Sequence, residues 1–228
     1  MTVKVDMKTL LESGAHFGHK TSRWHPKMAE YIHSHKNGAH IINLEKTVDG
    51  FEKALPKITE IVKSGKKVLI VDTQKQSKEL AKAAAESVKM PYVTERWVGG
   101  TLTNVETVNR QIKKLKDLER RMESGELKSR YNKLEVQRFQ EEIDLLNTRY
   151  GGIKEMSEQP AAVIVLDAVQ DKNAIREAIT LNIPVFAICD TNVDPSGIDY
   201  VIPGNDNSVK ATELYLNYFT EAIKEGKK

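Results

Sequence analysis

Uninterrupted apolar runs alternate with amphipathic helical patterns along most of the chain. Val, Ile and Leu dominate the runs VLIV, VIVL and FAIC, and shorter apolar runs occur in YVTE and IDYVIP. A strand that is apolar at every position is buried on both faces, which is typical of a parallel sheet with helices on each side. The alternation therefore predicts an α/β fold built on a doubly wound parallel sheet.

Helical patterns lie between these runs. We expect helices over residues 44–64, 74–89, 172–181 and 205–225, and a short strand in IINLE before the first of them. In the first helix, Val48, Phe51, Leu55, Ile58 and Val62 recur at steps of three and four, which indicates one buried face. Pro56 lies within this span, where a proline is expected to kink or shorten a helix.

Residues 105–150 break the alternation, because they contain two long helical patterns and no strand. Apolar residues at steps of three and four form one seam in each pattern: Val105, Val108, Ile112, Leu115, Leu118 and Met122, then Phe139, Ile143, Leu146 and Tyr150. Such seams are typical of a short coiled coil that folds back at SGELKSR. We therefore predict one α/β domain, residues 1–104 and 151–228, with a coiled-coil hairpin inserted at 105–150.

The charge is distributed unevenly over the 228 residues. The formal net charge is +3, but residues 1–104 carry 17 Lys and Arg against 11 Asp and Glu, whereas residues 151–228 carry 7 against 12. A polyanion such as RNA is therefore expected to meet the first half of the chain.

All six histidines lie in the first forty residues, in a segment that also mixes rings with cations. The rings of Phe17, Trp24 and Tyr31 interleave with the cations Lys20, Arg23, Lys27 and Lys36. Irregular or single-stranded RNA is bound by such mixtures, since bases stack on rings while cations meet phosphates. A metal site that uses His33 and His35, or His16 and His19, is the competing interpretation. The absence of paired cysteines or an HExxH helix disfavours it, so we predict no metal and no cofactor.

A second group of cations lies within the first helical pattern of the hairpin. Lys113 and Lys114 begin a basic stripe that continues through Lys116, Arg120 and Arg121. We take Lys113 and Lys114 as candidate phosphate contacts. A merely solvated face is an equal alternative, because nine acidic residues lie in residues 105–150.

The stretch RWVGGTLTN joins a predicted strand to the first hairpin helix. Gly99 and Gly100 suit a sharp reversal of the chain, and Thr103 or Asn104 is expected to cap the helix that follows. Arg96 and Trp97 are further candidates for contact with RNA. The spacing of the glycines differs from the dinucleotide-binding fingerprint, so no nucleotide is expected here.

Three of the apolar runs end in aspartate: Asp72, Asp167 and Asp190. The carboxyl ends of parallel strands meet at one edge of a sheet, and three carboxylates there suit Mg²⁺ and phosphoryl transfer. We favour a simpler interpretation, in which each aspartate orders the loop or helix after its strand. No P-loop lysine motif, G-x-S-x-G motif or Cys and His pair accompanies the aspartates. In the same way, Asp206 argues against a phosphate site at PGNDNSVKA, where a helix cap is expected.

Other features limit the compartment. No apolar run reaches the roughly 18 residues needed to span a bilayer, and the first residues do not resemble a secretory signal. The single cysteine, Cys189, lies in an apolar run and is expected to be buried, which fits a reducing compartment. We expect a cytoplasmic protein with no membrane partner and no small-molecule substrate.

Six blocks together resemble the bacterial family of small-subunit ribosomal protein number two. They are HFGHKTSRWHPKM, HIINLEKT, RWVGGTLTN, GGIKEM, IPVFAICDTNVDP and VIPGNDNSVKA, in order and with matching spacing over nearly the whole chain. The resemblance implies a flavodoxin-like domain with a projecting coiled-coil pair. It also implies a non-enzymatic structural role, in which the protein binds small-subunit ribosomal RNA and neighbouring ribosomal proteins where head meets body.

The resemblance further implies contact with the large mRNA-binding protein of multiple OB-type repeats. It marks Lys20, Arg23, Trp24, Lys27, Arg96 and Trp97 as candidates for RNA or neighbour contact. The segment VDTQKQS departs from the family, because Asp72 and Gln74 stand where a glycine and a cation are usual. AVQDKNA also lacks the histidine-bearing acidic pattern common there. The alternatives to the ribosomal role are a Mg²⁺-dependent phosphoryl-transfer enzyme and a coiled-coil adaptor.

Overall fold

A five-stranded parallel sheet forms the centre of the molecule in the computed structural model, which describes residues 4–156 and 158–228. The strands lie in the order β5-β4-β6-β7-β8, so the second of these five strands, β5, is at one edge and the others follow in sequence. Their bounds are β4 Val68–Val71, β5 Tyr92–Val93, β6 Ala162–Val165, β7 Val185–Cys189 and β8 Tyr200–Pro203. The predicted α/β class with a parallel sheet is confirmed.

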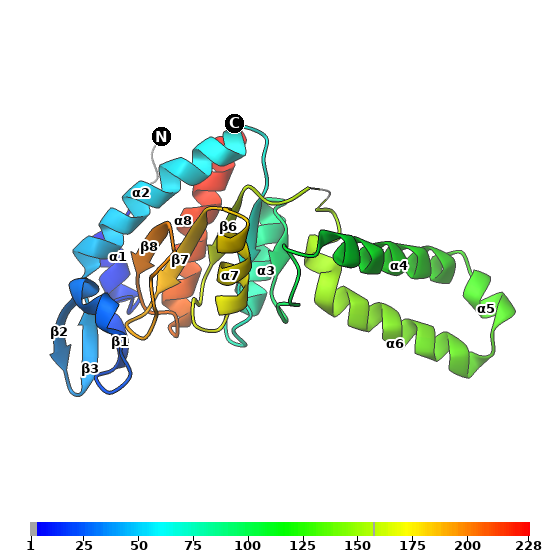
Figure 1. Ribbon diagram of the computed structural model, residues 1–228, viewed down its shortest axis with the longest axis horizontal. Helices are drawn as coiled ribbons and strands as arrows, with labels where there is room; N and C mark the ends of the chain where they lie inside the picture. Colours follow the sequence, from blue (N-terminus) through cyan, green and yellow to red (C-terminus); the bar gives the residue numbers. More distant parts are fainter. Residues whose placement is uncertain (1–3, 157) are drawn as a thin grey trace.

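Helices cover both faces of this sheet (Figure 1). On one face lie α2 Leu44–Lys63, α3 Lys78–Ser87 and α8 Val209–Gly226, whereas α7 Lys172–Thr180 lies on the other. Side chains alternate along each strand: Leu69 and Val71 join one core, while Val68 and Ile70 join the other. All four residues of β4 are buried, and this is why its sequence is apolar at every position.

The N-terminal segment forms a small antiparallel sheet, of which the sequence predicted only the strand in IINLE. The strands β1 Phe17–Lys20, β2 Ile32–Lys36 and β3 Ala39–Ile42 pair in the order β1-β3-β2, with η1 Pro26–Tyr31 between the first two. The helix α1 Met7–Glu12 precedes this sheet. The strand expected in IINLE is therefore β3, and it ends before Asn43, which caps α2.

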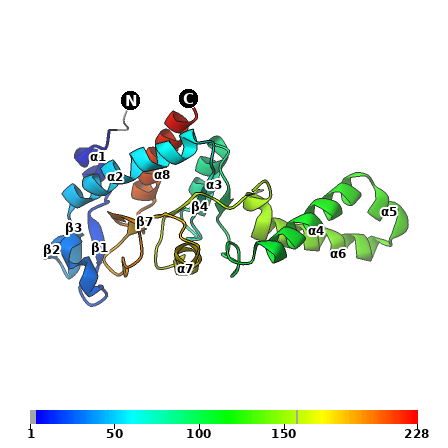
Figure 2. The ribbon, with the colours of Figure 1, turned by 45° about the horizontal axis from the view of Figure 1, so that its top comes forward.

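Two long helices project from the side of the central sheet that lies opposite the small antiparallel sheet (Figures 1 and 2). They are α4 Val105–Glu123 and α6 Lys133–Tyr150, joined through α5 Glu126–Arg130. Val108, Ile112, Leu115 and Leu118 of α4 are buried against Ile143 and Leu146 of α6 and their neighbours. The chain re-enters the domain through η2 Gly151–Ile153.

Two helices begin later than expected. The helix α3 begins at Lys78 instead of residue 74, and α8 begins at Val209 instead of residue 205, where the Ser208 side chain caps it by accepting a hydrogen bond from Ala211 N–H. The helix α2 continues through Pro56 to Lys63. Among residues 4–156 and 158–228, none of the helices combines the length and apolar character needed to cross a membrane.

Candidate functional site

Five of the predicted RNA-binding residues lie on or beside the small antiparallel sheet. Lys20 ends β1, Arg23 and Trp24 follow it, Lys27 lies in η1, and Lys36 ends β2. All five residues are exposed. The structure thus places these cations and this ring at one end of the molecule, away from the projecting helices (Figure 1).

Trp24 is positioned before any ligand binds. Its ring lies 5.4 Å from that of His40, measured between centroids and at an interplanar angle of 46°, yet the residue is 42% exposed. A ring that is held from one side and open on the other loses little conformational freedom when a base stacks on it.

Lys27 differs from the other cations because it has an anionic partner. Its Nζ lies 3.2 Å from Oδ1 of Asp194 and also contacts the hydroxyl of Ser196. Hydrogen bonds from Ser196, and then the contact with Lys27, lower the pKa of Asp194 to about 2. Asp194 is therefore ionised near neutral pH and offsets much of the positive charge of Lys27.

Glu177 organises the elbow RWVGGTLTN, although it lies far away in the sequence on α7. Its Oε1 accepts hydrogen bonds from Trp97 Nε1 at 2.9 Å and from the Gly100 N–H at 2.8 Å. Its Oε2 accepts from the N–H groups of Leu102 and Thr103 and from the Thr103 hydroxyl. The Glu177 carboxylate thus accepts hydrogen bonds from the N–H and hydroxyl donors of this chain reversal, which would otherwise lack partners.

The elbow exposes one of its two candidate contacts and buries the other. Arg96 is exposed, whereas Trp97 is only 8% exposed and packs in the hydrophobic core. The predicted cap is confirmed, because Asn104 Oδ1 accepts a hydrogen bond from Thr107 N–H. Only Gly100 of the two glycines has a left-handed backbone, with φ of +89°.

The predicted basic stripe of α4 is largely neutralised within the hairpin. Lys114 pairs with Glu142 of α6, and Lys116 Nζ lies 3.0 Å from Oε1 of Glu155. Arg120 and Arg121 both pair with Asp117. Within the described part of the chain, Lys113 is the one member of the stripe without an ion pair. Its helix, α4, lies at the opposite end of the molecule from β1, which carries Lys20 (Figure 1).

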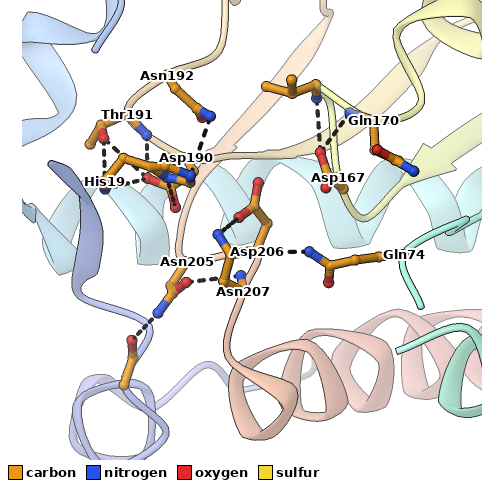
Figure 3. A network of polar contacts seen from close by, with 12 residues as sticks. His19, Gln74, Asp167, Gln170, Asp190, Thr191, Asn192, Asn205, Asp206 and Asn207 are labelled. Carbon is orange, nitrogen blue, oxygen red and sulfur yellow. Dashed lines mark hydrogen bonds and ion pairs between the residues drawn. The ribbon is translucent and has the colours of Figure 1, made fainter. Parts of the chain in front are cut away.

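The strand-end aspartates are buried at the carboxyl edge of the central sheet, at 0% exposure for Asp72, 8% for Asp167 and 1% for Asp190. Each holds the loop that follows it. Asp72 accepts from the Gln74 N–H, and Asp190 accepts from the Thr191 N–H and hydroxyl. Asp167 accepts from two consecutive N–H groups at 2.9 and 2.8 Å (Figure 3). These contacts agree with the loop-ordering interpretation.

Sequence reasoning missed the partners of Asp190. His19 Nδ1 lies 2.8 Å from Asp190 Oδ2, and the Asp206 carboxyl lies within hydrogen-bonding reach of Asp190. The contact with Asp190 raises the pKa of His19. Among the described residues, ligand atoms suited to a metal converge within 4.8 Å at His19, Asp190 and Asp206, and not at Asp72, Asp167 and Asp190, the set of the alternative Mg²⁺ interpretation.

Comparisons with known proteins match almost the whole chain. The family model described as ribosomal protein S2 covers residues 10–226. The small ribosomal subunit protein uS2 of Pasteurella multocida is 46% identical over 224 residues, which are 98% of this chain and 93% of that protein. The small ribosomal subunit protein uS2 of Oleidesulfovibrio alaskensis is 44% identical over 222 residues, covering 97% of this chain and 85% of that protein.

Proposed function

The chain belongs to the ribosomal protein S2 family, and from this membership we infer its function. It is a structural constituent of the small ribosomal subunit, acts in translation, and is not an enzyme. The observation that carries this conclusion is the match over residues 10–226. Asp72, Asp167 and Asp190 each order the loop that follows their strand, and this structural role is consistent with the conclusion.

The surface that we propose for ribosomal RNA is the small antiparallel sheet with its flanking turns. It combines the exposed cations Lys20, Arg23 and Lys36 with the exposed ring of Trp24. Cations supply the salt-dependent attraction to phosphates, and the ring offers a stacking platform worth about 1–3 kcal/mol per base. Lys27 contributes less to this surface, since Asp194 offsets its charge.

Arg96, Lys113 and Lys114 form separate, secondary contacts in this proposal. Arg96 is exposed at the elbow, and Lys113 on α4 has no ion pair with any described residue, whereas Lys114 must first exchange Glu142 for a phosphate. Trp97 supports RNA binding indirectly, because its buried indole holds the elbow in position through Glu177.

The finer architecture also belongs to this proposal. The strand order, which is 2-1-3-4-5 in chain order, supports the flavodoxin-like description. The buried seam between α4 and α6 supports a coiled-coil hairpin that is inserted at residues 105–150 into a domain formed by residues 1–104 and 151–228. We place the protein in the cytoplasm as part of the ribosome.

The projecting hairpin is our candidate for contact with neighbouring ribosomal proteins. Leu134 and Leu145 of α6 are 59% and 49% exposed, which leaves apolar side chains on the outer surface of the hairpin. The family resemblance adds two finer expectations: a position where head meets body, and contact with the large OB-repeat mRNA-binding protein. Deletion of residues 105–149 should strongly weaken contacts with ribosomal proteins and slightly weaken RNA binding, because Lys113 and Lys114 are lost with the hairpin. If the hairpin acts only as an adaptor for proteins, the deletion should leave RNA binding unchanged.

Sedimentation of the tagged full chain in cell lysates tests the function. We expect the chain to travel with small subunits at low salt and to leave them as salt rises, because phosphate contacts weaken with salt. A chain that stays at the top of the gradient at low salt would contradict the ribosomal role.

A paired comparison tests the RNA surface separately. Arg23→Ala with Trp24→Ala should reduce incorporation into small subunits, whereas Lys53→Ala with Lys82→Ala removes two exposed cations elsewhere and should have little effect. Equal incorporation of both double variants would show that the RNA surface lies elsewhere, while the family membership stands.

A further inference from the structure

Three side chains with metal-binding atoms meet where the small sheet contacts the central sheet. His19 lies in β1, Asp190 follows β7, and Asp206 lies between β8 and α8. One ligand atom from each lies within 4.8 Å of the other two. Figure 3 shows the Asp206 carboxyl reaching up from its loop toward the region beside Asp190 and His19.

The two carboxyls lie together with few donors between them. Asp190 and Asp206 are 1% and 3% exposed, and their carboxyls are within hydrogen-bonding reach of one another. Asp190 Oδ1 accepts from the N–H groups of His19 and Thr191, and Asp206 Oδ1 accepts from the side-chain amide of Asn207 at 2.6 Å. Buried carboxylates in contact need a proton or a cation between them.

The ring of His19 points to the same requirement. Its Nδ1 is shielded from solvent and lies 2.8 Å from Asp190 Oδ2, yet that oxygen is off the line of a proper hydrogen bond. The nitrogen therefore faces the carboxyls without a well-directed partner. A cation between the three groups would satisfy the ring nitrogen and both carboxylates at once.

A route from solvent reaches these groups. A cavity of about 530 Å³ is lined by His19 and Asp190 together with Lys20, Arg23 and Asn205. An ion can enter through it, and water from the cavity can complete the coordination.

We propose that His19, Asp190 and Asp206 form a divalent transition-metal site, and that Zn²⁺ is the ion that this donor set fits best. One imidazole nitrogen and two carboxylate oxygens are ordinary zinc ligands, and three protein ligands leave a fourth position for water. Mg²⁺ fits less well, because it prefers oxygen ligands in near-ideal octahedral geometry. The proposal does not depend on the RNA surface and replaces our expectation that the chain binds no metal.

Such an ion would tie the small sheet to the central one. The present connections include the His25 N–H to the Thr191 carbonyl at 2.8 Å and the Asn205 N–H to the Ala15 carbonyl at 3.0 Å. A ligand set drawn from both sheets stabilises the assembled arrangement, because the unfolded chain has no preformed site. The ion would thereby fix the sheet that carries Lys20, Arg23 and Trp24.

The test uses the purified full chain after treatment with a chelator. Equilibrium dialysis against Zn²⁺ followed by metal analysis should give one ion per chain, and zinc should raise the melting temperature. His19→Gln and Asp206→Asn should each weaken binding by at least tenfold. His33→Gln removes an exposed histidine of β2 and should bind like the unaltered chain.

Cobalt distinguishes the ligand set from adventitious binding. Co²⁺ in the site should show visible bands of a low-symmetry site without a thiolate charge-transfer band, because Cys189 is not among the three ligands. Circular dichroism should show that Asp206→Asn is folded, since asparagine resembles the protonated acid. Absence of zinc binding, or equal binding by the His19→Gln, Asp206→Asn and unaltered chains, would overturn the proposal in favour of a shared proton.

Discussion

The indole Nε1–H of Trp97 donates a hydrogen bond of 2.9 Å to Oε1 of Glu177, which joins the elbow before α4 to the helix α7. The same carboxylate also accepts hydrogen bonds from the backbone of Gly100, Leu102 and Thr103. The elbow therefore takes its shape from an acid 80 residues away along the chain. This contact lies just before the point where the hairpin leaves the domain at Val105.

Glu177→Gln should destabilise the protein. The substitution replaces one acceptor oxygen by an NH₂ group that faces N–H donors, and each buried donor left unpaired costs about 1–3 kcal/mol. We expect a loss of this size in chemical denaturation. Glu52→Gln on the exposed side of α2 is the control and should change the unfolding free energy by less than about 0.5 kcal/mol. Equal effects of the two substitutions would show that the contact contributes little.

The contribution of Glu177 to stability should depend on pH in a definite direction. Burial raises its pKa, but the hydrogen bonds from Trp97 and the backbone outweigh burial, so the net pKa is lowered. A lowered carboxyl pKa contributes stability above the unfolded value, and that contribution disappears as the pH falls through the folded value. In acid titrations of stability, the difference between the unaltered chain and Glu177→Gln should therefore shrink below about pH 4.

Asp171 should behave in the opposite way. It is 1% exposed and accepts hydrogen bonds from the Thr73 N–H and hydroxyl, while burial raises its pKa to about 7. A raised carboxyl pKa contributes stability below the unfolded value of about 4, and this contribution is lost as the pH rises to 7.

Asp171→Asn should therefore gain stability relative to the unaltered chain as the pH rises from 5 to 8, because asparagine resembles the protonated acid and cannot ionise. The two pKa units between pH 5 and the folded pKa limit this gain to at most about 3 kcal/mol. Urea unfolding at both pH values measures it. The prediction is wrong if the difference between the two chains is the same at pH 5 and at pH 8.

Periodicity and apolar runs predicted the elements of the domain, because burial on one or two faces leaves a local pattern in the sequence. The seam of Val108, Ile112 and Leu115 is such a pattern, and these residues are buried between α4 and α6 as expected. The run VLIV is another, since β4 is covered by helices on both faces.

The small sheet and the polar contacts left no comparable pattern. In β2 only Ile32 is partly buried and the other four residues are exposed, so its sequence lacks the alternation that marks a half-buried strand. His19 and Asp190, or Trp97 and Glu177, meet only after the chain has folded. Nothing local to either residue indicates its partner.

Gly99 and Gly100 should respond differently to alanine, although they are adjacent. Gly100 has a φ of +89°, and a Cβ there would lie 3.1 Å from Cβ of Asn104. Gly100→Ala should therefore cost about 1–2 kcal/mol. At Gly99 a Cβ would meet no described atom within 4 Å, so Gly99→Ala should be nearly neutral. Thermal melts of the two variants compare them directly, and equal costs would contradict the assigned backbone.

Asp194 should weaken RNA binding by holding Lys27. Its Oδ1 lies 3.2 Å from Lys27 Nζ, and both side chains are more than half exposed, so the pair competes with phosphates in solvent. Asp194→Asn frees the cation, and an exposed ion pair of this kind changes affinity by about 1.5- to 5-fold. We expect tighter binding to small-subunit RNA at low salt and no gain at high salt, where the attraction is screened. Asp49→Asn removes an exposed charge from α2 as a control. A gain of the same size from Asp49→Asn would assign the effect to net charge and remove Lys27 from the RNA surface.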